Sequence, residues 1–152
     1  MKPRIVAWFF NGLKVKNMLN IKQNIIWMAG FFDGEGCITF TKRYHTNKAG
    51  VEKCYRGLIV SVSQVELEPI KIFSDYFTGG YRYHWLNKNN RKQHEFRASG
   101  KNAIGLLKIL LPYLVVKKSQ AELALSYKTS NDLEKELIIK NMSEIKKGTY
   151  KP

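Results

Sequence analysis

Two carboxylates alternate with two glycines in four consecutive residues, a pattern suited to chemistry: Asp33, Gly34, Glu35 and Gly36. They follow an unbroken run of eight apolar or small residues, 25–32. A helix that is apolar all round must be buried on every side. The C-terminal end of a helix carries partial negative charge, which disfavours carboxylates. Two acids placed there therefore indicate a metal ion or a specific charged partner.

The bulk composition limits the class of protein. The 152 residues are 44% hydrophobic, which predicts one folded domain with a proper core. A net charge of +14 indicates a polyanionic partner, nucleic acid first and an anionic membrane surface second. No apolar run approaches the roughly 18 residues that span a bilayer, which argues against a membrane-embedded protein. Cys37 and Cys54 lack zinc-site spacing and are expected to be free thiols in a reducing compartment.

Periodicity and turn residues predict an α+β domain of order αββαββα with C-terminal helices. Its four-stranded antiparallel sheet is covered by helices on one face. Residues 1–19 are expected to be a basic extension, and residues 20–152 a single domain. The first helix is expected over 21–33, with Asn20 and Gln23 as its cap. Strands are expected over 37–43, 58–64, 81–86 and 93–99, with polar turns over 46–53 and 87–92. Helices are expected from Pro69 to Gly79, from Ser99 to Leu111, over 119–127, and from Asn131 through a stripe of Leu133, Leu137, Ile138, Met142 and Ile145.

The sheet face opposite the core positions is predicted to bind nucleic acid. Its residues are polar and net basic, of the types that hydrogen-bond base edges and phosphates. They are Thr39, Thr41, Arg43, Ser61, Ser63, Arg82, His84, Gln93, Glu95 and Arg97, with Lys88 and Arg91 in the adjoining turn. A plain solvated face is the alternative. The register of 81–86 is open, because a one-residue slip exchanges Arg82 and His84 for Tyr81, Tyr83 and Trp85.

Residues 28–36, Met-Ala-Gly-Phe-Phe-Asp-Gly-Glu-Gly, resemble the signature of the LAGLIDADG homing endonucleases. Ala29, Gly30, Asp33 and Gly36 match outright, and Glu35 replaces the last Asp. The resemblance covers about 20–127. It implies site-specific cleavage of double-stranded DNA with Mg²⁺ or another divalent cation. Because the chain has one motif, it also implies a homodimer acting on a long pseudo-palindromic target.

The first helix has a flank with few side chains, which would let two such helices approach backbone to backbone. In the homodimer that the resemblance implies, Ala29, Gly30, Phe31 and Asp33 are expected at the interface. The other interpretation is that the glycines only mark the end of the helix.

The resemblance also implies roles for individual residues. Glu35, with the neighbouring carbonyl of Gly34, would hold the metal, since hard divalent cations prefer oxygen ligands. Gln64 would position the nucleophilic water. Lys117, in a Pro-Tyr-Leu…Lys…Gln-Ala segment, would complete the catalytic pocket. Some members carry a second basic residue soon after the Gln, where this chain has Glu66 and Glu68, and Lys71 or Lys118 could substitute for it.

Other functions fit the same sequence. An intron RNA maturase or a non-cleaving DNA-binding regulator could use this fold, and a generic basic RNA-binding protein would make the motif a coincidence. The segment before Asp33 has no acid, which fits an organellar targeting peptide, a DNA-touching arm or a simple extension. Frequent Lys, Asn, Ile, Tyr and Phe fit an A+T-rich genome. The expected location is therefore intracellular, in a mitochondrion or plastid or in a bacterial cytoplasm.

Overall fold

This computed structural model describes residues 15–148, with residues 15–20 and 81–83 described through their backbone alone. Most of the proposed N-terminal extension, residues 1–14, lies outside the described residues. The elements follow the expected α+β order. They are α2 (Val15–Glu35), β1 (Gly36–Thr46), β2 (Glu52–Gln64), α3 (Leu67–Tyr76), β3 (Tyr81–Leu86), β4 (Lys92–Ser99), α4 (Gly100–Leu110), the 3₁₀ turn η1 (Leu111–Tyr113), α5 (Lys118–Ser126) and α6 (Asp132–Lys147).

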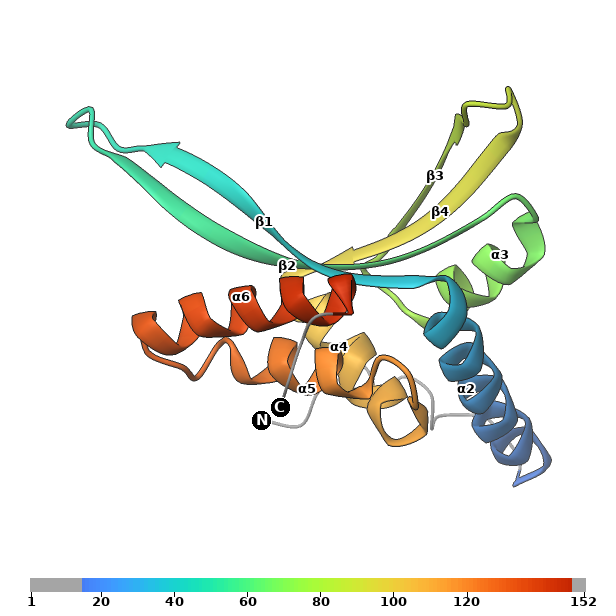
Figure 1. Ribbon diagram of the computed structural model, residues 1–152. Coiled ribbons are helices and arrows are strands. Elements are labelled where there is room, and N and C mark those ends of the chain that lie inside the picture. Colours follow the sequence, from blue (N-terminus) through green and yellow to red (C-terminus); the bar gives the residue numbers. More distant parts are fainter. Residues whose placement is uncertain (1–14, 149–152) are drawn as a thin grey trace.

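The four strands form one antiparallel sheet in the order β1-β2-β4-β3, as the sequence predicts. Figure 1 shows the sheet curving above the helices, with the hairpins β1–β2 and β3–β4 splayed apart. Helices α4, α5 and α6 lie below one side, α3 lies below β3–β4, and α2 runs down from the start of β1. All described helices therefore lie on one side of the sheet, and its other face is left open.

The core forms where the apolar positions of the sheet meet these helices. Ile38, Val60 and Phe96 lie on the covered face and are buried, together with Phe32 of α2 and Phe73 of α3. The expected inward positions of β1 and β2 are confirmed, because alternate residues of a strand point to opposite faces. Burying this apolar surface is the main stabilising contribution to the fold.

The first helix is longer than the sequence predicts. It begins at Val15, six residues before the expected start, so Asn20 lies inside the helix and the prediction that it caps the helix is wrong. Residues 15–19 contain neither Gly nor Pro, so nothing in their backbone preferences ends the helix there. The other end is close to expectation, since α2 gives way to β1 at Gly36.

The first hairpin is also longer than predicted. Strand β1 continues to Thr46 and β2 begins at Glu52, which leaves only residues 47–51 as the loop. Most of the added residues are exposed on both faces, and they carry no apolar alternation that would mark a strand. The predicted free cysteines are confirmed: Cys37 and Cys54 are both unpaired thiols.

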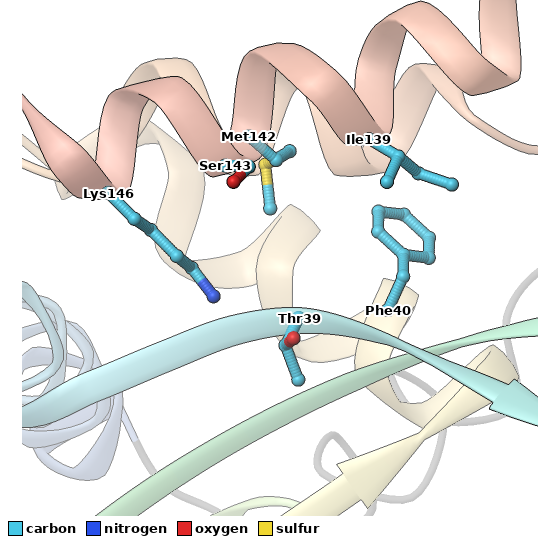
Figure 2. Close-up of a pocket in the computed structure, with 6 residues that line it drawn as sticks. All are labelled: Thr39, Phe40, Ile139, Met142, Ser143 and Lys146. Atoms are coloured by element: carbon cyan, nitrogen blue, oxygen red, sulfur yellow. The ribbon is translucent and has the colours of Figure 1, made fainter. Parts of the chain in front are cut away.

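Helix α6 packs through only part of its apolar stripe. Ile138 and Met142 are buried, whereas Leu133 is 87% exposed and Leu137 is 55% exposed. Figure 2 shows Ile139 of α6 above Phe40 of β1 and Met142 above Thr39, where they line a cavity of about 200 Å³. The start of this helix is as predicted: Asn131 and Glu134 form a reciprocal capping box.

Candidate nuclease site and nucleic-acid interface

The carboxylate of Asp33 binds the backbone of a distant segment. Its Oδ2 accepts a hydrogen bond from the amide of Val115 (2.7 Å), and its Oδ1 accepts one from the amide of Lys117 (2.8 Å). The side chain is half-buried. Asp33 therefore joins the end of α2 to the segment that precedes α5. It was expected at a dimer interface, but the structure gives its carboxylate partners within its own chain.

These hydrogen bonds bring Lys117 to the end of the motif. Its Nζ donates to the backbone carbonyl of Asp33, two residues before Glu35. Glu35 is the last residue of α2 and its side chain is exposed. The structure thus places a cation and an accessible carboxylate at the same helix end. The catalytic roles expected of Lys117 and Glu35 stay predictions.

Gln64 ends β2 near the same place. The register pairs Gly36 with Val62, so Gln64 lies two residues beyond the residue opposite the start of β1. Its Oε1 accepts a hydrogen bond from the amide of Val65 (2.8 Å), which orients the side-chain amide. Its proposed role toward water stays a prediction.

The donors at this helix end suit a hard cation. Glu35 offers carboxylate oxygens and Gly34 a backbone carbonyl, and such oxygens are what Mg²⁺ and Ca²⁺ prefer. Within residues 15–148, no three His, Cys, Asp or Glu side chains come together in a group that could hold a metal ion. One chain thus contributes one motif carboxylate, and a well-charged site would need oxygens from a second source.

The outer face of α2 is open. A Cβ added at Gly30 or Gly34 would meet no atom within 4 Å, and Ile26 and Trp27 are exposed on the same helix. Ala29 is fully buried in the core of its own chain, so its assignment to the dimer interface is wrong. The helix turns by about 100° per residue. Neighbouring motif residues such as Ala29 and Gly30 therefore lie on different faces of the helix.

Phe31 lies at the border of these two faces. It is half-buried, stacks on Trp27 with ring centroids 5.2 Å apart, and contacts the buried Phe73 at 6.1 Å. Its position leaves part of the ring at the open surface. Its expected place at an interface stays a prediction.

The register of the strands fixes which side chains share the open face. Ser61 pairs with Cys37 on one side and with Arg97 on the other, and the alternation extends this face along each strand. Eight of the predicted nucleic-acid-binding positions lie on it: Thr39, Thr41, Arg43, Ser61, Ser63, Gln93, Glu95 and Arg97. Lys88 and Arg91 lie in the exposed loop between β3 and β4.

Two predicted positions lie on the wrong face. Arg82 pairs with Phe96 and His84 pairs with His94, so both positions belong to the covered side of the sheet. The open face instead carries positions 81 and 83, with Trp85 opposite Gln93. The cause is the one-residue slip: Phe96 and Ala98 of β4 are buried, and they set the register that β3 must follow.

The same register adds residues that sequence reasoning missed. His45 pairs with Lys53, and Arg43 pairs with Tyr55, so the far end of the first hairpin extends the open face with basic and aromatic side chains. The sequence could have assigned these residues to the open face only if the full length of the first hairpin had been known. Their polar sequence did not mark them as strand.

The two hairpin loops are built alike. In residues 47–51, Asn47 Oδ1 accepts from the amides of Ala49 and Val51, and Gly50 has φ of 77°. In residues 87–91, Asn87 Oδ1 accepts from the amides of Asn89 and Arg91, and Asn90 has φ of 57°. Each loop presents an exposed lysine after its Asn, Lys48 or Lys88. The repeated Asn followed three residues later by Gly or Asn was the available signal for these turns.

Solved structures share this architecture. The homing endonuclease I-CvuI in complex with its target aligns with a TM-score of 0.58 and 21% identity, over 86% of this chain and 82% of that chain. The archaeal intron-encoded homing endonuclease I-Vdi141I, complexed with DNA, aligns with a TM-score of 0.61 and 15% identity, over 87% of each chain. The LAGLIDADG meganuclease I-AabMI, bound to uncleaved DNA, aligns with a TM-score of 0.52 and 21% identity, over 82% of this chain but 40% of that chain. The fold is therefore that of the LAGLIDADG homing endonucleases.

The family assignment rests on the sequence as well. The family model for LAGLIDADG endonucleases matches residues 28–133, from the motif to the start of α6. This chain belongs to the LAGLIDADG endonuclease family. No curated protein sequence matches it significantly. Among the described helices, none has the length and apolar character needed to cross a membrane.

Proposed function

We propose that this protein is a site-specific double-strand DNA endonuclease of the intron-homing type. It would act as a homodimer, with a divalent metal, on a long pseudo-palindromic target. The observation that carries the proposal is the end of α2, where Glu35 is exposed, Lys117 Nζ donates to the backbone carbonyl of Asp33 two residues earlier, and the helix face bearing Gly30 and Gly34 is open. A binding protein has no need of a carboxylate facing phosphate.

Two features support the homodimer. The open face of α2 lets two helices approach closely at their glycines. One chain also contributes only one motif carboxylate at the end of α2. Two copies of this chain would bring two such carboxylates to the meeting point of the helices.

The residues at this point have distinct tasks in the proposed reaction. Glu35 and the Gly34 carbonyl of each protomer would hold Mg²⁺, which when bound supplies charge neutralisation at the scissile phosphate and activation of a water. The Lys117 ammonium, held at the end of α2, would stabilise negative charge that develops on the phosphate. Gln64 would orient the attacking water through its amide.

The open sheet face would supply the binding energy and the sequence readout. Each protomer would lay this face in the major groove of one half-site, where base edges are distinguishable. The dimer carries +28, twice the +14 of one chain, which suits a long duplex.

The decisive experiment separates binding from cutting. Glu35→Gln keeps the shape of the side chain and removes its charge, so affinity for DNA should stay equal or rise slightly. Cleavage in magnesium should fall by several orders of magnitude, because the metal ligand is lost. Binding is measured in calcium and cleavage in magnesium on the same DNA, selected from a random duplex library by the wild-type protein.

Two further variants provide a milder effect and a control. Lys117→Met should reduce cleavage less severely, because it withdraws only charge stabilisation. Glu122→Gln, at an exposed position on α5, makes the same chemical change away from the site and should alter neither property. Wild-type protein that binds its selected DNA tightly and never cuts it would favour the maturase or the non-cleaving regulator.

A further inference from the structure

We propose that Glu95 is a positioning residue that fixes the guanidinium of Arg97 for readout of a guanine in the target. The inference rests on the proposed function, since it needs DNA on the open face of the sheet. It also changes the role expected of Glu95, from a residue that contacts bases to one that acts through its neighbour.

Glu95 is the one buried charged residue among those whose burial is described, at 5% exposed. It lies on the open face, opposite Ser63 of β2 and position 83 of β3. Its Oε1 accepts a hydrogen bond from Arg97 Nε at 2.6 Å, and its Oε2 accepts one from Ser63 Oγ at 3.3 Å. Both carboxylate oxygens thus have partners within the sheet.

A carboxylate buried on the open face of the sheet requires a physical explanation. A buried carboxylate is costly unless it is paired and hydrogen-bonded, and a negative charge on a DNA-binding face repels phosphates. The Arg97 side chain is 33% exposed while that of Glu95 is 6% exposed. The guanidinium therefore lies nearer the surface and shields the carboxylate, which leaves Glu95 poorly placed to contact a base itself.

The ion pair has a direct consequence for Arg97. An arginine side chain is long and flexible, and ordering it at an interface costs conformational entropy. A short charge-assisted hydrogen bond to Nε sets the plane of the guanidinium before DNA arrives. Because Nε is hydrogen-bonded to Glu95, we assign the contact with the base edge to the terminal nitrogens. Two parallel hydrogen bonds from an arginine to guanine O6 and N7 are the commonest specific contact in the major groove.

The test is the base preference of the full-length protein on its selected duplex, measured in calcium with all four bases at each position. In Glu95→Met, which lacks both acceptors, preference for guanine at one position should fall by about five- to 150-fold, the range that one arginine–guanine contact confers. Affinity for non-specific DNA should stay equal or rise, since a negative charge is removed. Glu95→Gln keeps an acceptor and should retain part of the preference.

Two other variants identify the pathway of the effect. Arg97→Lys keeps a cation for Glu95 but lacks the planar fork, so it should lose preference at the same base. Adding Glu95→Met to Arg97→Lys should then change base preference no further. Glu136→Met is the matched control: Glu136 pairs with Arg56 at 3.8 Å on the helix-covered side, so the same change in charge should leave base preference intact.

The outcomes separate this inference from the proposed function. If Arg97→Lys changes the preference and Glu95→Met does not, the positioning role is wrong while sheet readout stands. If Glu95→Met lowers the melting temperature and weakens all bases equally, its role is structural and the inference is overturned. If neither Arg97→Lys nor Arg43→Lys changes any preference, the open face does not read the target, and the inference fails with that part of the proposed function.

Discussion

At the scale of residues, the two motif carboxylates have different surroundings although they stand two positions apart. Asp33 is half-buried and accepts hydrogen bonds from the amides of Val115 and Lys117. Glu35 is exposed at the last position of α2. One acid therefore holds two segments of the fold together, whereas the other is accessible from outside. This difference supports the proposal that Glu35 is the catalytic acid of the motif.

Removing the Asp33 carboxylate should destabilise the protomer. Asp33→Ala leaves two amides without their acceptor: the exposed amide of Val115 can bond to water instead, whereas the part-buried amide of Lys117, left unsatisfied, costs about 1–3 kcal/mol. We expect a loss in this range in the free energy of unfolding, measured by urea denaturation, with Asp33→Asn between this variant and wild type. Asp75→Ala, at an exposed position of α3, should have little effect. Unchanged stability in Asp33→Ala would show that these hydrogen bonds do not hold the 115–117 segment.

Gly36 shows how closely this turn is packed. A Cβ added there would lie 2.5 Å from the backbone carbonyl oxygen of Phe32 and 2.3 Å from its ring. No rotamer change of Phe32 can relieve the contact with its backbone. The glycine is thus needed for the abrupt passage from α2 into β1, which fixes Glu35 at the point where β1 begins.

At the scale of elements, α2 serves two different surfaces. Ala29 lies in the core of its own chain, while Gly30 lies on the open side of the helix. This difference between neighbouring residues shows that α2, although apolar in sequence, packs one face against its own core and leaves another face exposed. A second copy of the chain would cover this face in the proposed dimer.

Leucine substitutions at these neighbouring positions should give opposite results. Ala29→Leu inserts volume into a filled core and should destabilise the protomer by about 1–3 kcal/mol. The Cβ that Gly30→Leu adds meets no atom within 4 Å, so the protomer should stay folded while the dimer dissociates at a higher protein concentration than wild type does. Circular dichroism melting follows the first effect, and sedimentation velocity across a concentration series follows the second. A stable dimer of Gly30→Leu would exclude close helix approach at this glycine.

The elements also show what the sequence can and cannot specify. Buried apolar positions such as Ile38, Val60 and Phe96 predict the strands that contain them, because alternation and burial have the same period. The outer half of the first hairpin carries polar residues on both faces, so it lacks that signal. In β3, Tyr and Trp suit either face, and only pairing with β4 decides between them.

The candidate site likewise has one part that the sequence predicts and another that it does not. Glu35 is recognisable because it belongs to a contiguous motif. The contact of Asp33 with Val115 and Lys117 joins residues more than 80 positions apart, and no local pattern encodes it. The shielding of Glu95 by Arg97 likewise depends on side-chain packing within the sheet.

At the scale of the whole molecule, the open face combines two kinds of contact. Exposed Lys48 and Lys88 stand at the tips of two similarly built loops, at the outer ends of the splayed hairpins (Figure 1). Trp85 and Arg97 lie on the face of the sheet itself. Lysines at the rim suit phosphates, which position the protein without reading sequence, whereas the residues on the face can meet base edges.

Salt dependence should distinguish these two kinds of contact in the assembled dimer. Each phosphate contact contributes about −0.9 to the slope of log K against log salt concentration. Losing one lysine per chain removes two contacts per dimer, so Lys48→Ala or Lys88→Ala should make the slope shallower by about 1.8, with base preference unchanged. Trp85→Ala should keep the slope and instead reduce preference at one base pair, because an apolar surface favours the thymine methyl group. His84→Ala, on the opposite side of the same strand, is the control and should change neither property. A slope change of about 0.9 for a tip lysine would indicate that one protomer, not two, engages the duplex.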